Sequence, residues 1–239
     1  MESPIYVLLS QQQAMQRQME VVANNVANVN TSGFKNRGVL FEDFLKKPDP
    51  KFTHHMVSDR GTIRDTSQGS LLKTDAPLDI AISGPGYFAI ETTEGTQYTR
   101  QGSFQLDSEG NLVTPNGSKV LSGGGQPITI PAEAKEITIG RDGMISTDRG
   151  DLGRLQLVRF ENEEQMEETH SGLYKTSEAP VPDDQSSLMQ GMVEGSNVKP
   201  VIEISRILEI SRNYQRTSKL IDAENERLRN AIRTLSRVS

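Results

Sequence analysis

A helical apolar repeat runs through both ends of this chain and encloses a segment with a strand-type repeat, which restricts the fold to distinct α and β parts. At each end the repeat positions recur at alternating intervals of three and four residues. This spacing gives each helix one narrow apolar stripe, and such a stripe needs a partner. The N-terminal positions are Ile5, Leu8, Gln12, Met15, Met19, Val22, Val26 and Val29. The C-terminal positions are Ile207, Ile210, Tyr214, Thr217, Ile221, Glu224, Leu228, Ala231, Leu235 and Val238.

Boundary signals accompany both helices. Ser3 is a suitable N-cap and Pro4 suits the first helical position, so the first helix is expected within residues 1–33. Its stop signal is the Asn-Thr-Ser-Gly string at 30–33. Asn197 is expected to cap the last helix, within residues 197–239. If the middle of the chain goes out and returns, the two helices pair antiparallel as a coiled-coil-like unit.

Residues 71–180 change to the period of two that is typical of strands. Leu78, Ile80 and Ile82 alternate with smaller or polar residues, and strings such as Asn-Gly, Asp-Gly and Gly-Pro-Gly separate the short runs. This pattern predicts a central all-β domain, either an antiparallel sandwich or a distorted barrel. The fold class is therefore α+β. Two connectors complete the expected organisation: 34–70, partly extended with a short helix around Phe41, and 181–196.

Composition excludes several classes of protein. Hydrophobic residues make up 34% of the chain and aromatics 5%, which favours an extended molecule with a modest core. The net charge is −6 without a basic block, so a nucleic-acid partner is not expected. No apolar run approaches the length that spans a bilayer, and the N-terminus lacks the basic start and cleavage site of a signal peptide. Without cysteine, disulfides and thiolate metal sites are excluded.

No catalytic, cofactor or metal site is predicted. The histidines lack the i, i+4 spacing of a helical metal pair, and no phosphate-binding glycine loop or nucleophile elbow is present. A cell-wall hydrolase would need two carboxylates facing one cleft. The clustered Asp residues instead fall at turns, where their backbone preferences explain them.

The most specific local pattern is an Asn-rich string, ANNVANVNTSGFK, at residues 23–35. On a helix, Asn24, Asn25 and Asn28 share one flank of the apolar stripe, while Ala23 and Ala27 share the other. Asn is a poor helix former, so this clustering suggests a binding role. A helix that frays into an Asn-rich turn is the alternative. The predicted partner-binding residues are Met15, Met19, Val22, Asn24, Asn25, Val26, Asn28, Val29, Asn197, Ile207, Ile210, Tyr214, Ile221, Leu228 and Leu235.

Three separated motifs give the chain a family resemblance. They are the string at 23–35, a central motif made of LDIAI at 78–82, the turn at 84–88 and YTRQGSF at 98–104, and VEGSNV at 193–198. These motifs resemble the signatures of bacterial flagellar rod and hook proteins, in the same order. The resemblance covers essentially the whole chain. Within that family, the short length and the GRLQLV run at 153–158 favour the proximal-rod branch over its distal-rod sister, which shares all three motifs.

The resemblance implies a structural axial protein of the flagellar basal body. Its terminal helices would pack with copies of itself and with sister proximal- and distal-rod proteins, while the β domain forms an outer layer. It also implies passage through the flagellar type III export apparatus without signal cleavage, and assembly in the part of the rod that crosses the periplasm. The alternatives are a distal-rod or hook-type sister, a β-domain binding module for a surface glycan or protein, and a wall hydrolase.

Overall fold

The computed structural model describes residues 5–49, 52–134, 136–169 and 172–236, with side chains omitted at 42–49, 52–59 and 235. The chain divides into two compact units. The helical unit comprises the described parts of Met1–Ala27, Arg37–Asp65 and Lys199–Ser239. The β unit comprises the described parts of Asn28–Asn36 and Thr66–Val198. The predicted α+β class is confirmed.

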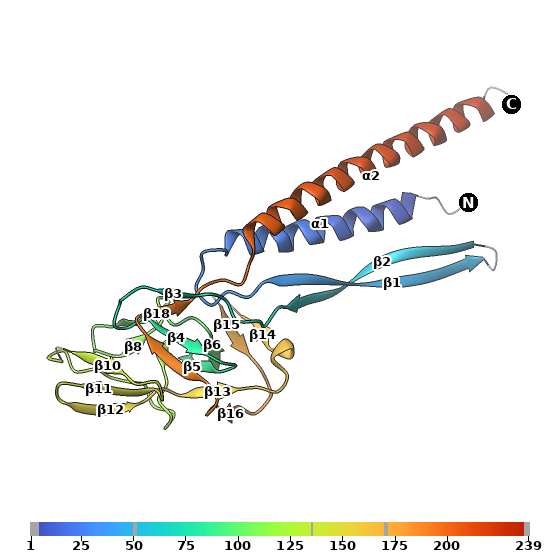
Figure 1. The fold of residues 1–239 in the computed structure, drawn as a ribbon. Coiled ribbons are helices and arrows are strands. Elements are labelled where there is room, and N and C mark those ends of the chain that lie inside the picture. Colours follow the sequence, from blue (N-terminus) through green and yellow to red (C-terminus); the bar gives the residue numbers. More distant parts are fainter. Residues whose placement is uncertain (1–4, 50–51, 135, 170–171, 237–239) are drawn as a thin grey trace. The chain divides into compact units, whose positions relative to one another are not determined.

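Two helices and one long hairpin build the helical unit (Figure 1). Helix α1 spans Ile5–Ala27 and helix α2 spans Pro200–Leu235. They pack antiparallel, because Asn25 contacts Glu203 at one end of the pair whereas Met15 lines a groove with Tyr214 further along. Since α2 has 36 residues and α1 only 23, the C-terminal part of α2 has no counterpart in α1.

The segment predicted as a connector at 34–70 forms an antiparallel hairpin instead, so the short helix expected around Phe41 is wrong. Strand β1, Arg37–Asp49, pairs with β2, Phe52–Arg64, from Arg37 opposite Arg64 to Asp49 opposite Phe52. Of the Lys-Pro-Asp-Pro string at 47–50, which was expected to break any regular element, residues 47–49 are the last residues of β1, and Pro50 lies outside the described residues. Pairing between these two strands, interrupted by irregularities at Leu40/Phe41 and Lys46/Asp49, takes the place of a local helix.

The helix boundaries also differ from those expected. Helix α1 ends at Ala27, before the predicted stop, because Asn28 and Thr31 form their own turn: the Thr31 amide donates to the Asn28 carbonyl, and the Thr31 hydroxyl donates to the Asn28 side chain. At the other end, Lys199 rather than Asn197 occupies the N-cap position, and Pro200 begins α2. The predicted Asn197 cap is therefore wrong, and its side chain is engaged elsewhere.

The β unit is an antiparallel assembly of short strands that does not close into a barrel. Its largest sheet has the order β14-β15-β6-β5-β9-β8-β7, and β13 pairs with both β5 and β16. Smaller sheets join β10-β11-β12, β17-β4 and β18-β3. The strands are β3 Leu71–Lys73, β4 Ile80–Ser83, β5 Tyr87–Thr92, β6 Gly95–Thr99, β7 Gln105–Leu106, β8 Leu112–Val113, β9 Lys119–Val120, β10 Ile137–Ile139, β11 Met144–Thr147, β12 Gly150–Arg154, β13 Leu157–Arg159, β14 Glu167–Glu168, β15 Leu173–Lys175, β16 Val181–Pro182, β17 Ser187–Gln190 and β18 Met192–Glu194, with a 3₁₀ turn at Glu163–Gln165.

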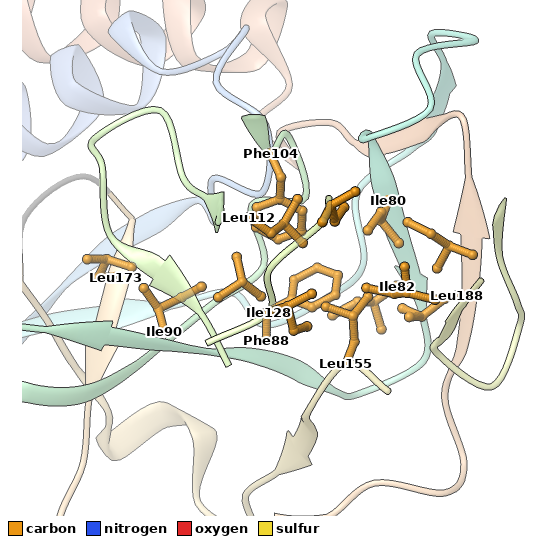
Figure 2. Close-up of a cluster of buried hydrophobic side chains, with 14 residues drawn as sticks. Ile80, Ile82, Phe88, Ile90, Phe104, Leu112, Ile128, Leu155, Leu173 and Leu188 are labelled. Carbon is orange, nitrogen blue, oxygen red and sulfur yellow. The ribbon is translucent and has the colours of Figure 1, made fainter. Parts of the chain in front are cut away.

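Strand β5 is buried on both faces and lies between two apolar clusters. Phe88 and Ile90 belong to the larger hydrophobic core, to which β4, β8–β11, β15, β17 and neighbouring loops also contribute (Figure 2). Tyr87 and Ala89 point the other way, into an aromatic cluster that includes Tyr98, Phe160 and Tyr174. Alternate residues of one strand thus serve two cores, which explains an uninterrupted apolar run within an antiparallel sheet.

The predicted turns of the β region are largely confirmed, whereas one connector is not. Turns at 108–111, at 115–117 and at 142–143 each join two paired antiparallel strands. Ile128 and Ile130 are buried, but Thr129 between them makes only an isolated bridge. The expected connector at 181–196 contains β16, β17 and β18, because its residues complete sheets begun by β13, β4 and β3.

Candidate assembly surface and motif junctions

The predicted apolar stripes meet along the α1–α2 contact of the helical unit, but they are only partly covered. Val22 is buried, and Met15, Met19, Ile207, Ile210 and Ile221 are half-buried. A groove of about 250 Å³ opens between the helices, lined by Met15, Gln16, Met19, Ile210, Ser211 and Tyr214. The intramolecular pair therefore leaves part of each stripe accessible to a further helix.

A second apolar surface lies on α2 away from the predicted stripe. Val201 is 78% exposed, Ile204 50% and Leu208 54%. Their spacing of three and four residues places them together on one side of the first two turns. On these turns α2 is apolar on several sides, a composition that is typical of a helix with partners on more than one face. We call Val201, Ile204 and Leu208 the outer α2 patch.

The last turns of α2 are exposed all round. Every described side chain from 225 to 234 is exposed, including Leu228 at 38% and Ile232 at 67%. Thr217, which interrupts the predicted stripe, is buried at 4% exposure. Glu224, the second interruption, forms an ion pair with Arg227 of the same helix. Leu235 is the last residue of α2, and its side chain lies outside those described.

Asn25 is fully buried and holds three segments of the helical unit together. Its side-chain amide donates to the Arg37 carbonyl at 2.8 Å and accepts from the Arg37 amide at 3.0 Å, so it pairs with the first residue of β1 as a neighbouring strand would. The same amide group donates to the Glu203 carboxylate of α2 at 3.2 Å. Glu203 is itself 1% exposed and accepts from Arg206 at 2.7 Å. Asn25 therefore ties α1, β1 and α2 to one another.

The other asparagines of the motif play different parts. Asn24 is exposed on the outer surface of α1. Asn28 forms the turn that ends the helix, and Val26 and Val29 are half-buried. The three asparagines predicted to form one flank are therefore not equivalent. Asn25 is buried and hydrogen-bonded to backbone, Asn24 is exposed, and Asn28 belongs to the turn after the helix.

A buried ionic junction lies in the β unit. The Lys35 ammonium donates to the Glu194 carboxylate at 2.6 Å, and the two side chains are 1% and 0% exposed. Lys35 also donates to the Ser67 carbonyl, while the Gly69 amide donates to Glu194. Burial lowers the pKa of Lys35 below its ordinary value of 10.5, and the negative charge of Glu194 opposes that change.

Arg100 brings a second cation to the same carboxylate. Its guanidinium donates to the Gly84 carbonyl at 2.7 Å and to Glu194 at 3.4 Å, and it stacks 4.9 Å from the centre of the Tyr87 ring. The side chain of Arg100 is 3% exposed. Two buried cations consequently share one buried anion, which makes Glu194 the residue on which the charge balance depends.

Asn197 extends this junction. Its side-chain oxygen accepts from the Asn36 amide at 2.6 Å, its side-chain amide donates to the Ser67 carbonyl at 3.0 Å, and its own backbone amide donates to the Phe34 carbonyl at 3.3 Å. Next to it, the Gly33 amide donates to the Glu194 carbonyl at 2.7 Å. Gly33 has a φ of 69°, and a Cβ at this position would lie 2.7 Å from the Arg100 carbonyl carbon.

The β unit therefore joins residues from all three sequence motifs: 33–35 from the first, Gly84 and Arg100 from the central one, and 194–197 from the last. Each motif can be recognised in the sequence, but no local pattern predicts that the three meet. Neither Lys35, Arg100 nor Glu194 was singled out, because each lies in a short run without periodicity. The one available signal was the charge inside otherwise apolar or glycine-rich strings.

The described part of the chain offers few features for other chemistry. None of its helices is long and apolar enough to cross a membrane. No group of three or more His, Asp or Glu side chains among the described residues has the arrangement of a metal site.

Comparison with known proteins places these motifs in families. A model described as Flagella basal body rod protein matches residues 5–35. One described as Flagellar hook protein FlgE/F/G D1 domain matches 81–147, and one described as Flagellar basal body rod FlgEFG protein C-terminal matches 189–234. The three matches include the helical stripes and most of the junction.

Full-length relatives agree with these matches. The chain is 38% identical to the flagellar basal-body rod protein FlgF of Caulobacter vibrioides, over 100% of both chains. It is 34% identical to FlgF of Mesorhizobium japonicum, over 98% of both. It is also 34% identical to the rod protein FlgG of Bacillus subtilis, over 95% of this chain and 97% of the relative.

These relatives are flagellar basal-body rod proteins, a structural class that the paired terminal helices and the short-stranded β unit fit. The chain belongs to the flagellar basal-body rod protein family. Its 38% identity to FlgF, over 100% of this chain and of the relative, confirms the branch that the short length and the 153–158 run predicted. The structural role in the flagellar rod is thereby confirmed.

Proposed function

We propose that the chain polymerises through its helical unit and transmits torque along the rod. The carrying observation is the outer α2 patch together with the half-covered α1–α2 stripes. Helices of this kind are marginal in isolation and gain stability by packing. A repeated head-to-tail contact of such surfaces that does not close yields a helical filament.

The proposed neighbours are copies of this chain and its sister proximal- and distal-rod proteins. The similarity to both FlgF and FlgG supports this, because proteins that share terminal motifs can share one packing geometry. Export through the flagellar type III apparatus without signal cleavage, and a position in the part of the rod that crosses the periplasm, complete the proposal. The absence of cysteine suits an oxidising compartment.

We further propose that the protein has no enzymatic activity. The relatives' names describe rod proteins, which supports this view and gives no support to a β unit that binds a surface glycan. The acidic residues at the turns stabilise the local structure. Asp107 accepts hydrogen bonds from the Glu109 and Asn111 amides, and Asp142 forms an ion pair with Arg154.

The test is a double charge substitution in the outer α2 patch, Ile204→Glu with Leu208→Glu. We expect loss of rod incorporation and of motility, with circular dichroism of the purified monomer unchanged, because both side chains are exposed there. Gln215→Glu, at an exposed polar position of the same helix, is the matched control. Normal rods and swimming in the double variant would refute the proposal.

A further inference from the structure

The chain passes between its two units four times, because the helical unit consists of three chain segments and the β unit of two. The passages follow Ala27, Asn36, Asp65 and Val198. A mechanical load on the helices can reach the β unit through all four of these connections or mainly through one. We call the stretches of chain next to each passage the connecting segments. The load is shared only if hydrogen bonds hold these segments together inside each unit.

Inside the β unit, Asn197 fastens three of the four segments. It lies one residue before the last passage, and its side chain accepts from the Asn36 amide at the second passage. It donates to both the carbonyl and the hydroxyl of Ser67, close to the third. Its backbone amide adds a bond to Phe34. The side chain of Asn197 thus accepts a hydrogen bond from one connecting segment, at Asn36, and donates hydrogen bonds to another, at Ser67.

Inside the helical unit, Asn25 holds connecting segments together in the same way. It lies two residues before the first passage, and it binds both backbone groups of Arg37, the first residue after the second passage. Its remaining donor reaches Glu203, in the first turn of α2. The amide is fully buried, so water cannot easily replace these bonds.

We propose that Asn25 and Asn197 are a pair of clamps that gather the connecting segments at the exit of each unit, so that load is shared among several covalent connections. This inference deepens the proposed function, on which it rests for the source of the load. Asn197 therefore has a positioning role in place of the helix cap that its sequence context suggests.

Hydrogen exchange of single backbone amides tests the clamps in the full-length monomer. In Asn197→Ala we expect the Asn36 amide to exchange at least tenfold faster, and in Asn25→Ala the Arg37 amide. Asn197→Asp keeps the acceptor oxygen and should keep the Asn36 amide protected while losing the bond to the Ser67 carbonyl. Asn30→Ala and Asn225→Ala, at exposed positions, are the matched controls. Exchange within twofold of the parent in Asn197→Ala would overturn the inference.

A distance measurement tests load sharing directly. Since the chain has no cysteine, spin labels can be placed at Gln215→Cys in α2 and Ser108→Cys in the β unit without background. We expect each clamp variant at least to double the width of the distance distribution between the labels, while the controls leave it unchanged. If Asn25→Ala prevents folding of the helical unit, the Asn197 variants alone decide the outcome, and an unchanged width overturns the inference.

The readouts separate this inference from the proposed function. If the Ile204→Glu, Leu208→Glu double variant still forms normal rods, the proposed function is refuted, irrespective of the hydrogen-exchange and distance results for the clamp variants. Conversely, suppose that rod formation requires the outer α2 patch while the clamp variants leave the width of the distance distribution unchanged. That result would refute the clamp inference and leave the proposed function standing. In cells that assemble rods, swimming speed of the Asn197→Ala strain should fall more steeply with viscosity than that of the parent; a parallel fall counts against load sharing.

Discussion

The buried pair of Lys35 and Glu194 permits a quantitative prediction. Replacing Glu194 by Gln keeps the shape of the side chain and an acceptor for the Gly69 amide but removes the negative charge. The Lys35 and Arg100 cations then lose the one carboxylate that forms an ion pair with both of them, and both cations are almost completely buried. We expect this single change to destabilise the β unit strongly.

The magnitude follows from the burial. Removing one partner of a buried ion pair costs about 3–5 kcal/mol, because the remaining charge is left in a medium of low polarity. Lys35→Met removes the cation instead and leaves Glu194 paired with Arg100, so we expect a smaller cost, about 1–3 kcal/mol. In the double variant the net charge of the junction returns to that of the parent, and a coupling energy of about 1–3 kcal/mol is expected.

Urea unfolding followed by tyrosine fluorescence measures this cycle, since the aromatic cluster lies in the β unit. The exposed ion pair of Arg149 and Glu133, 3.0 Å apart, supplies the control cycle, in which no measurable coupling is expected. A coupling between Lys35 and Glu194 below about 0.5 kcal/mol, the limit for independent sites, would refute the electrostatic reasoning.

Three further predictions concern other features. Asn25→Ala should lower the stability of the helical unit by about 2–4 kcal/mol, because three hydrogen bonds of a buried side chain are lost. The control Asn225→Ala should change it by less than about 0.5 kcal/mol. Thermal unfolding followed by circular dichroism at 222 nm compares the two variants. Gly102→Ala should cost at least about 3 kcal/mol, because its Cβ would lie 1.7 Å from the Ile80 carbonyl oxygen; a urea midpoint equal to that of Gly124→Ala would contradict this. Hydrogen bonds from Asn111 lower the pKa of Asp107 below 3.8, so its stabilising contribution exists above that value and disappears as the pH falls through the lowered pKa; the difference in urea midpoint between the parent and Asp107→Asn should shrink from pH 7 to pH 2.

Local patterns determined a substantial part of this protein. The period of the apolar positions predicted both terminal helices, since helix formation and an amphipathic stripe depend on neighbours three and four residues apart. The turns at 115–117 and 142–143 were predictable for the same reason, because Asn-Gly and Asp-Gly supply the backbone conformation of a tight turn within a few residues. The three motif strings also sufficed for the family.

Tertiary structure alone decided the features that depend on distant partners. The hairpin at 37–64 prevailed over the predicted connector because each of its strands is stabilised by the other, a pairing that no short window reveals. The sequence context of Asn197 predicted a helix cap. Its side chain is instead hydrogen-bonded to Asn36 and Ser67, which are more than a hundred residues away in the sequence. Lys35 meets Glu194 across 159 residues, and a charge can be buried only where the fold brings its counter-charge.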